Sequence, residues 1–411
     1  MERISQKERE RLRALARKQL EFAHSPRNDQ ILRQYEALGQ GRREDPTVRL
    51  LFSNFMREVV YNRMECIHPE ARRMECQLLT TMVGRELFDD DTPISPTFDV
   101  SWDTWVNPFG TEPRQIQDEA SGGYHIVNQF EELPDGMDLL RGGSFGVNRD
   151  STSAWIGTVE EVLGDLLPTR MVMCSLPAMI TNYLVRIMSM QNYYMAMYDY
   201  PDLLHQVMDM ATKVYEDYYD FLEREKLLCP TVGLSPINQE SFAFNSELPA
   251  ENVTKTTQCW GFMEAQETHA VSPATFGEFM FPYQDRMNRH FGLLTYGCCE
   301  RVDAIWEDYL SKWKNLRKLS VSPFNDERRV GEYLRGTNVV YYSKPRAEFV
   351  TAREGMDEEA LRAYFKEVCQ CASGCLFEIA QREVGTIYGD YERGRRYVQI
   401  AKECVQEYWR P

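Results

Sequence analysis

The chain has 411 residues, of which 43% are apolar and 12% aromatic, enough to build a large buried core. Its 47 Lys and Arg residues stand against 63 Asp and Glu residues, which gives a net charge of −16. Because this acidic balance repels phosphate backbones, it argues against nucleic acid as a partner.

The start of the chain, Met1–Glu8, is charged and lacks the apolar segment of a signal peptide. No run of the sequence approaches the 18 or so consecutive apolar residues that a membrane-spanning helix needs. Eleven cysteines, an odd number scattered along the chain, are typical of a reducing compartment rather than of a disulfide framework. We therefore expect a cytoplasmic protein with no membrane partner.

The first part of the chain reads as helical. Residues 2–22, 48–61 and 69–87 carry apolar side chains at helical spacing. An acidic, proline-containing break follows at Asp89–Pro96. The break predicts a boundary near residue 95.

The middle of the chain changes character. Residues 97–106 alternate as a strand would, and the glycines of residues 107–150, Gly122 and Gly123 among them, predict turns. The segment 203–226 has one apolar face and predicts a long helix. The Met and Tyr residues of 188–200 are either core or a subunit contact, and the second reading would give a homodimer.

The C-terminal third repeats a strand–helix rhythm. Strand-like runs, with helical segments between them, begin near Gly292, Arg317, Asn338 and Cys375. Such alternation indicates parallel βα units and favours a (β/α)8 TIM barrel over an open sheet. We therefore expect an α/β barrel over residues 95–411, with residues 1–94 packed on it as an N-terminal helical extension.

The run Gly292–Glu300 ends in two adjacent cysteines and a glutamate. A strand followed by a helix, here predicted over 301–310, aims the end of the strand into the mouth of an α/β fold. The thiolates of Cys298 and Cys299 could bind a soft metal or act as nucleophiles there. The alternative is that both are small buried apolar residues.

Other predicted strand ends add ligands and charges on the same face. Zinc is the metal that thiolate and imidazole favour, so the candidate ligands are Cys298 or Cys299, with Glu267 and His269. Neighbours on a strand point to opposite faces, so one cysteine of the pair is expected to be structural. Lys344 could anchor a substrate carboxylate or be an ordinary solvated lysine.

Aromatic and polar residues near the same strand ends are candidate substrate contacts. Trp102, Trp105 and Tyr342 could wall a pocket that suits a quaternary amine, or could serve only in packing. Gln266 and Tyr296 complete this predicted set.

Several of these runs resemble, in order, the uroporphyrinogen decarboxylase superfamily, and most closely its corrinoid-methyltransferase-like branch. The resemblance covers roughly residues 95–411 and implies a (β/α)8 barrel. It is carried by Trp260–Glu267 (Trp-Gly-Phe-Met-Glu-Ala-Gln-Glu), Phe281–Gln284, Tyr296–Glu300, Leu319–Pro323 and Lys344-Pro345.

The resemblance implies a zinc site, and the chain departs from its pattern. Methyltransferases of the superfamily bind zinc through a His-x-Cys pair and a later Cys or His, whereas Tyr296–Glu300 keeps the cysteine without the histidine. Gly385 stands where related sequences have another histidine, so Glu267 or Glu383 would have to replace a ligand. The arginine motif of the decarboxylases is absent, and the chain reads Trp105–Gly110 instead.

These observations predict a zinc-dependent methyltransferase. It would move a methyl group between a small methylated compound, or a thiol, and a corrinoid carried by a partner protein. Zinc on Cys298 or Cys299 with Glu267 would polarise the reacting heteroatom, and Glu300 and Lys344 are further catalytic candidates. Two alternatives stay open: a metal-independent, decarboxylase-like lyase, and a barrel that binds a corrinoid or a partner protein without turnover.

Overall fold

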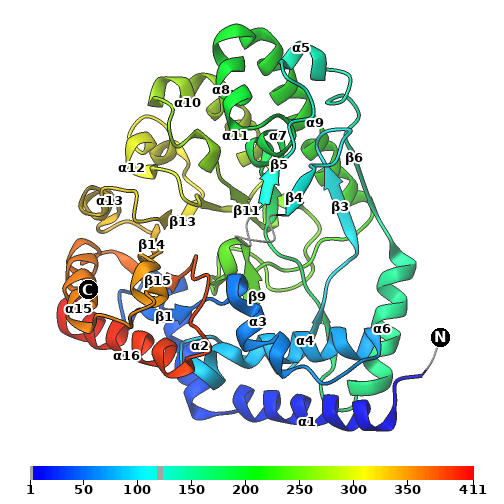
Figure 1. Ribbon diagram of the computed structural model, residues 1–411, viewed down its shortest axis with the longest axis vertical. Helices are drawn as coiled ribbons and strands as arrows, with labels where there is room; N and C mark the ends of the chain where they lie inside the picture. The colour runs from blue at the N-terminus through cyan, green and yellow to red at the C-terminus, as the bar shows by residue number, and fades with distance from the viewer. Residues whose placement is uncertain (1–2, 118–123) are drawn as a thin grey trace.

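The computed structural model describes residues 3–117 and 124–411. At its centre, seven strands form one parallel sheet in the order β1-β15-β14-β13-β12-β11-β8 (Figure 1). The strands of this sheet are β1 (Thr47–Leu50), β8 (Leu176–Ala178), β11 (Trp260–Met263), β12 (Leu293–Tyr296), β13 (Leu316–Val321), β14 (Val340–Ser343) and β15 (Leu376–Gln381).

The register of the sheet brings several strand ends to one edge. Met263 of β11 lies opposite Tyr296 of β12, and Val321 of β13 lies opposite Ser343 of β14. Because all these strands run in parallel, the residues that follow them meet at the carboxyl edge of the sheet, where α/β folds place their sites.

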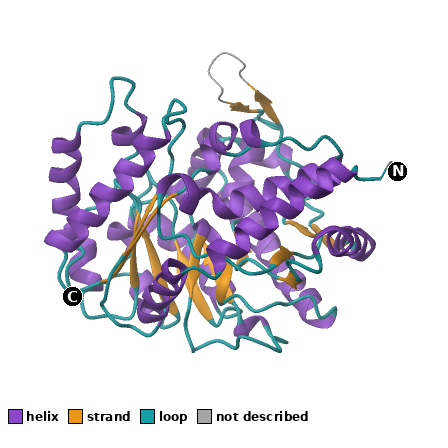
Figure 2. Cartoon of the chain, turned by 90° about the horizontal axis from the view of Figure 1, so that it is seen from below, coloured by secondary structure: helices purple, strands orange, loops and turns teal. Residues whose placement is uncertain are grey.

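Helices surround the sheet (Figure 2). In the C-terminal half one or two helical segments separate successive strands, as the sequence predicted. The helices from residue 133 onward are α5 (Leu133–Gly136), α6 (Arg149–Leu163), α7 (Ile180–Met188), α8 (Met190–Asp199), α9 (Pro201–Arg224), α10 (Pro273–Phe279), α11 (Phe281–Asn288), α12 (Val302–Ile305), α13 (Glu327–Leu334), α14 (Glu348–Thr351), α15 (Glu358–Cys371) and α16 (Tyr391–Tyr408).

The N-terminal helices lie along one side of the molecule, and the C-terminal helix α16 lies beside them and contacts β1 (Figure 1). Ser5 caps the first of these helices through a reciprocal bond pair with Glu8, which explains where it begins. They are α1 (Gln6–Ala23), α2 (Pro26–Gly39), α3 (Met56–Val59) and α4 (Pro69–Val83).

Short strands form four further two-stranded sheets: β2 with β7 in parallel, and β3 with β6, β4 with β5 and β9 with β10 antiparallel. Their bounds are β2 (Phe98–Val100), β3 (Thr104–Asn107), β4 (Gln115–Gln117), β5 (Tyr124–Ile126), β6 (Ser144–Val147), β7 (Thr169–Met171), β9 (Gly233–Ile237) and β10 (Ser241–Ala243). Gly122 and Gly123, for which turns were predicted, lie outside the described residues.

The sequence predicted the later elements well. All four strand-like runs of the C-terminal third are strands of the large sheet, and the helix expected over 203–226 is α9. Helix α10 begins after Ser272, because the Ser272 hydroxyl accepts a hydrogen bond from the backbone N–H of Thr275.

Two helix predictions were wrong. Residues 48–61 do not form one helix: they begin with β1, which pairs with β15, and only Met56–Val59 is α-helical. β1 alternates polar and apolar residues, but its four residues are too few to establish a strand pattern before the apolar residues that follow, and all four are buried. The helix predicted over 301–310 is reduced to Val302–Ile305.

The first 94 residues are therefore not purely helical, because they contribute β1 to the sheet. The division of the chain near residue 95 stays a prediction. Among the described residues, β1 and β8 are the two edge strands of the large sheet and do not pair with each other. β2 and β7 pair only with each other. The structure is thus α/β with a seven-stranded parallel sheet, and a closed eight-stranded barrel stays a prediction.

A buried ion pair occupies the interior of the sheet, away from its carboxyl edge. Lys318 of β13 pairs with Glu378 of β15, and its ammonium also donates to Ser241 Oγ and, at 2.9 Å, to the carbonyl of Phe242. Ser241 and Phe242 belong to β10, so the β9–β10 hairpin covers this pair.

No helix in the described part of the chain combines the length and apolar character that a membrane crossing requires.

Candidate functional site

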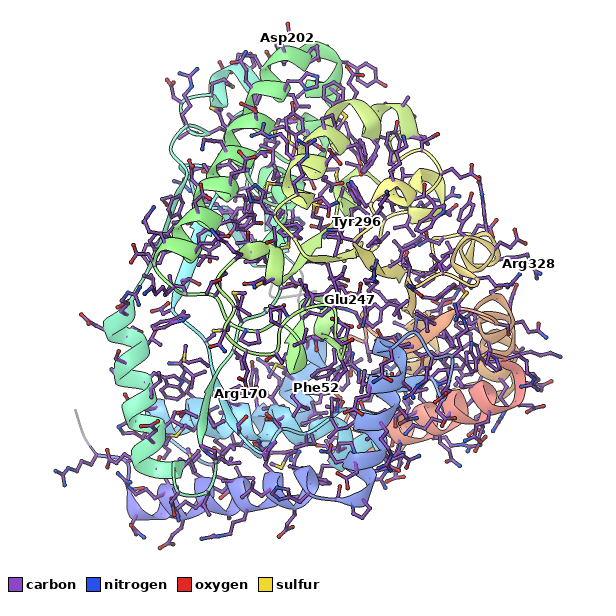
Figure 3. The ribbon with its side chains drawn as sticks, turned by 180° about the vertical axis from the view of Figure 1, so that it is seen from behind. Phe52, Arg170, Asp202, Glu247, Tyr296 and Arg328 are labelled. Carbon is purple, nitrogen blue, oxygen red and sulfur yellow. The ribbon has the colours of Figure 1, made fainter. Side chains whose placement is uncertain are left out.

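The adjacent cysteines lie in a tight turn after β12. Tyr296, the last residue of the strand, is fully buried in the interior, whereas Asp202 and Arg328 lie at the outer surface (Figure 3). Gly297 follows with φ +100°, and a Cβ atom there would lie 3.2 Å from Cβ of Ser320. Glycine therefore permits both the reversal of the chain and its close approach to β13.

Cys298 and Cys299 are each half-buried, and their Sγ atoms lie 3.8 Å apart. The hydrogen bond from the Cys298 thiol lowers the pKa of Cys299 to about 7, and the positive charge of Lys344 acts in the same direction. The same hydrogen bond, together with burial, raises the pKa of Cys298. The pair therefore loses its first proton near neutral pH, from Cys299.

Glu300 holds the turn in place. Its Oε2 accepts from the backbone N–H of Cys298 at 2.6 Å, and its Oε1 accepts from the N–H of Ala265 at 2.8 Å. The carboxylate thus ties the turn after β12 to the segment after β11. Burial raises the pKa of Glu300. Because both oxygens contact backbone, Glu300 positions the thiols.

Lys344 follows β14 and reaches the cysteine turn after β12, across the intervening strand β13. Its Nζ donates to the carbonyl of Cys298 at 2.7 Å and to Oε1 of Gln239 at 2.8 Å, and it lies 3.8 Å from Sγ of Cys298. The residue is 4% exposed, and no described carboxylate forms an ion pair with it. A buried ammonium with neutral acceptors favours a thiolate nearby.

Glu267 is held by helix α7. Its two carboxylate oxygens accept from Thr181 Oγ1 and Asn182 Nδ2, each at 2.9 Å. The hydroxyl of Tyr194 donates to the Glu267 carbonyl at 2.7 Å. Both oxygens are thus already occupied by neutral donors.

Glu264 is a third buried carboxyl group, which sequence reasoning did not single out. Burial, with the charges of Glu267 and Glu300, raises its pKa well above the ordinary value. Its Oε2 accepts from the backbone N–H of Gln266 at 3.0 Å. Glu264 directly follows the last residue of β11. Its position at the end of a strand is the sequence feature that could have identified it as a candidate site residue.

Two cavities meet at Cys299. One, of about 530 Å³, is lined by Cys299, Gln266, Glu267, His269 and Phe324 among others. The structure therefore brings four of the predicted site residues to one cavity, since Gln266, Glu267, His269 and Cys299 were all expected at the site.

The second cavity, of about 400 Å³, is lined by Cys299 and Lys344 together with segments that follow β13, β14 and β15. Cys299 and Phe324 line both cavities, whereas Cys298 lines neither of them. Of the two thiols, Cys299 is therefore the one that a small molecule can reach.

The predicted zinc ligands do not form a preassembled metal site. Within residues 3–117 and 124–411, no group of three or more His, Cys, Asp or Glu side chains is arranged to hold a metal ion. Glu267 is bonded to Thr181 and Asn182, and the ring of His269 packs edge-on against Phe324 at 5.5 Å. The donor set does not fit zinc in this arrangement, and zinc binding stays a prediction.

The predicted aromatic walls lie elsewhere. Trp102 and Trp105 line a different cavity, of about 560 Å³, whose walls carry no charged residue. Tyr296 and Tyr342 are buried; their hydroxyls donate to Oε1 of Gln284 at 3.3 Å and to the carbonyl of Gln239 at 2.6 Å.

Sequence reasoning missed Gln239, which binds Lys344 through its side chain. The residue has φ +65° and lies between β9 and β10, in a segment without a recognisable motif. Sequence reasoning also missed Arg382, which follows β15 and lines the cavity of Lys344. Its place directly after a predicted strand was the signal available.

The fold and site define an α/β protein with a parallel sheet and a thiol–lysine centre at the carboxyl edge of its middle strands. No family model matches the chain, and no curated protein matches it. Among solved structures, a methyltransferase from Methanosarcina mazei is similar over 91% of this chain and 98% of that chain, with 15% sequence identity and a TM-score of 0.49. No reaction and no residue role is transferred from that protein to this chain.

Proposed function

We propose that this protein is a methyltransferase in which Cys299 is the general acid and base at the reacting heteroatom. The observation that carries the proposal is the position of Cys299, which lines two cavities. The adjacent thiol of Cys298 and the charge of Lys344 lower its pKa toward neutral pH. A group that titrates near neutral pH is suited to accept and return a proton in each turnover.

In the direction of thiol methylation, the Cys299 thiolate takes the proton from the thiol of the substrate. The substrate sulfur then forms a bond to the methyl carbon, and the bond between that carbon and the donor breaks with its electron pair left on the donor. In the reverse direction, Cys299 returns the proton to the heteroatom that loses its methyl group.

The surrounding residues hold this centre. Cys298 donates its S–H to Cys299, and Lys344 stabilises the negative charge that develops on the sulfur pair. Glu300 fixes the turn that carries both thiols. We propose that the other reactant in the methyl transfer is a corrinoid bound to a second protein, whose cobalt would carry the methyl group. This element of the proposal rests on the sequence resemblance.

The test uses methylcobalamin as methyl donor and a panel of small thiols as acceptors, with loss of methylcobalamin followed by absorbance. We expect Cys299→Ser to slow thiol methylation about 100-fold or more, the usual effect of losing a general acid or base. Cys174→Ser, which removes an exposed thiol from the uncharged cavity, is the matched control and keeps the rate. Equal rates for Cys299→Ser and the wild type would contradict the proposal and favour the lyase or the non-catalytic alternative.

Zinc is tested separately, because no step above requires it. Elemental analysis of the purified chain and of the double variant Cys298→Ala/Cys299→Ala measures the metal directly. About one zinc per chain that is lost in the variant would restore the metal-dependent mechanism predicted from the sequence.

A further inference from the structure

The cavity of about 400 Å³ beside Cys299 concentrates positive charge in a chain whose net charge is −16. Three of its lining residues are cations and two are carboxylates: Lys344, Arg346, Arg382, Glu348 and Glu383. These charges come from segments that follow neighbouring strands, so the cavity lies at the carboxyl edge of the sheet.

Arg382 is incompletely paired. Its Nη2 lies 3.9 Å from Oε1 of Glu240, and its Nε lies 3.8 Å from Oε1 of Glu383, which is too long for a hydrogen bond in either case. The Nε and Nη1 atoms are buried and have no hydrogen-bond partner within the described chain. An unsatisfied buried guanidinium is costly, and such a group in a cavity wall points to a ligand that completes it.

Lys344 is the second cation of this wall: among the described residues no carboxylate lies within ion-pair distance of it, although its charge acts on the buried carboxyl group of Glu300. The acceptors of Lys344 are the neutral carbonyl of Cys298 and the amide of Gln239. Arg346, by contrast, is exposed and lies 3.7 Å from Glu348 at the rim of the cavity. The features of this wall that can bind a ligand are therefore the ammonium of Lys344 and the N–H groups of Arg382 that lack an acceptor.

We propose that this cavity binds an anionic oxygen group of the substrate, a carboxylate or a phosphate, through Arg382 and Lys344. The reacting atom of the same substrate then lies at Cys299, because Cys299 belongs to the wall of this cavity. The inference rests on the proposed function and names the class of its substrate: a small anionic molecule.

The test compares two alkylating reagents that differ only in charge. In both, the Cys299 thiolate attacks the methylene carbon, the carbon–iodine bond breaks, and iodide leaves with the electron pair. Iodoacetate carries a carboxylate, whereas iodoacetamide carries a neutral amide in its place. Peptide mass spectrometry measures the rate of alkylation by each reagent at Cys299, and the iodoacetate rate is divided by the iodoacetamide rate. This ratio is then divided by the same ratio at Cys174, which lies in the uncharged cavity.

We expect this normalised ratio to favour iodoacetate about tenfold, the effect of one hydrogen bond between charged groups. Arg382→Gln reduces the ratio to about one, and Arg382→Lys keeps most of it because the charge remains. Arg346→Gln, which removes a rim charge already paired with Glu348, is the matched control and leaves the ratio unchanged. Competition by acetate or by inorganic phosphate then shows which anion the cavity prefers.

A ratio near one in the wild type, or a preference that survives in Arg382→Gln, overturns the inference. Calorimetric titration of the Cys299→Ser variant with acetate and phosphate tests the anion site separately from the proposed function, because anion binding does not need the thiol. If Cys299→Ser binds an anion and the double variant Cys299→Ser/Arg382→Gln does not, the anion site is supported even when Cys299 takes no part in methyl transfer. No binding of either anion to Cys299→Ser overturns the site and leaves the proposed function to its own experiment.

Discussion

Two lysines are buried to the same degree in this protein and differ in what surrounds them. Lys318 of β13 is 2% exposed and Lys344, just after β14, is 4% exposed. Lys318 is paired with Glu378, and Ser241 and Phe242 take up its remaining hydrogen bonds. The acceptors of Lys344 are two neutral oxygens and the sulfur of Cys298, and its charge also acts on the carboxyl group of Glu300.

The difference separates a structural cation from a reactive one. All the donors of Lys318 are used within the protein, although burial lowers its pKa. The charge of Lys344 remains available to a thiolate or to a bound anion. Burial alone therefore does not distinguish the two lysines, and the lack of a carboxylate in ion-pair contact is the reason that Lys344 is the one we propose for function.

The largest effect expected from this comparison concerns stability. Lys318→Met leaves the carboxylate of Glu378 buried without its partner, so the free energy of unfolding should fall by about 3–5 kcal/mol. Urea denaturation measures it. Lys344→Met is the matched control and should cost about 1 kcal/mol or less, because its acceptors are neutral. Equal losses of stability in Lys318→Met and Lys344→Met would contradict the comparison. The double variant Lys318→Met/Glu378→Gln should recover part of the stability that Lys318→Met loses.

The next effect concerns the pH dependence of Cys299. In Cys298→Ala the donated S–H is lost, so the pKa of Cys299 should rise from about 7 toward its ordinary value of 9.0. Thiolate accumulates as the pH rises through this pKa, so alkylation at pH 7 should slow about tenfold or more while the rates above pH 9 converge. Iodoacetamide pH–rate profiles measure the shift. An unchanged profile would show that Cys298 does not set the reactivity.

The smallest effect is expected at Tyr342, which lies between the two lysines. Its ring is 5.4 Å from Nζ of Lys318, and its hydroxyl donates to the carbonyl of Gln239. Tyr342→Phe keeps the ring and removes that hydrogen bond, so stability should fall by about 1 kcal/mol. The pH–rate profile of Cys299 should shift only slightly, since the Gln239 side chain can still accept from Lys344. A loss as large as that of Lys318→Met would show that the two environments are not independent.

Sequence patterns predicted the part of the fold where strands and helices alternate regularly. The cysteine run and Lys344 were expected at strand ends on the same face, and the structure brings Lys344 to 3.8 Å from the Cys298 sulfur. The pattern failed at β1, because an alternation of only four residues is too short to be distinguished from the helical spacing of the segment around it. Zinc could not be settled from residue types, since Glu267 proved to be bonded to α7.

The contacts of Gln239 and Arg382 were beyond sequence reasoning for a different reason. Gln239 and its neighbour Glu240 both have positive φ, and the backbone path that results is set by the packing of the β9–β10 hairpin rather than by a local motif. The missing partners of Arg382 depend on side-chain placement across several strand ends. Such properties arise only when the chain is assembled.

The β9–β10 hairpin also has a consequence for how this protein could diversify. Residue 239 offers its side chain to one lysine, whereas residues 241 and 242 serve the other through a hydroxyl and a main-chain carbonyl. A replacement at position 239 therefore alters the chemistry beside the sulfur atoms and leaves the interior ion pair intact. Under the proposed function, substitutions at this single position are expected to change the reactivity of the thiols without rebuilding the scaffold that supports them.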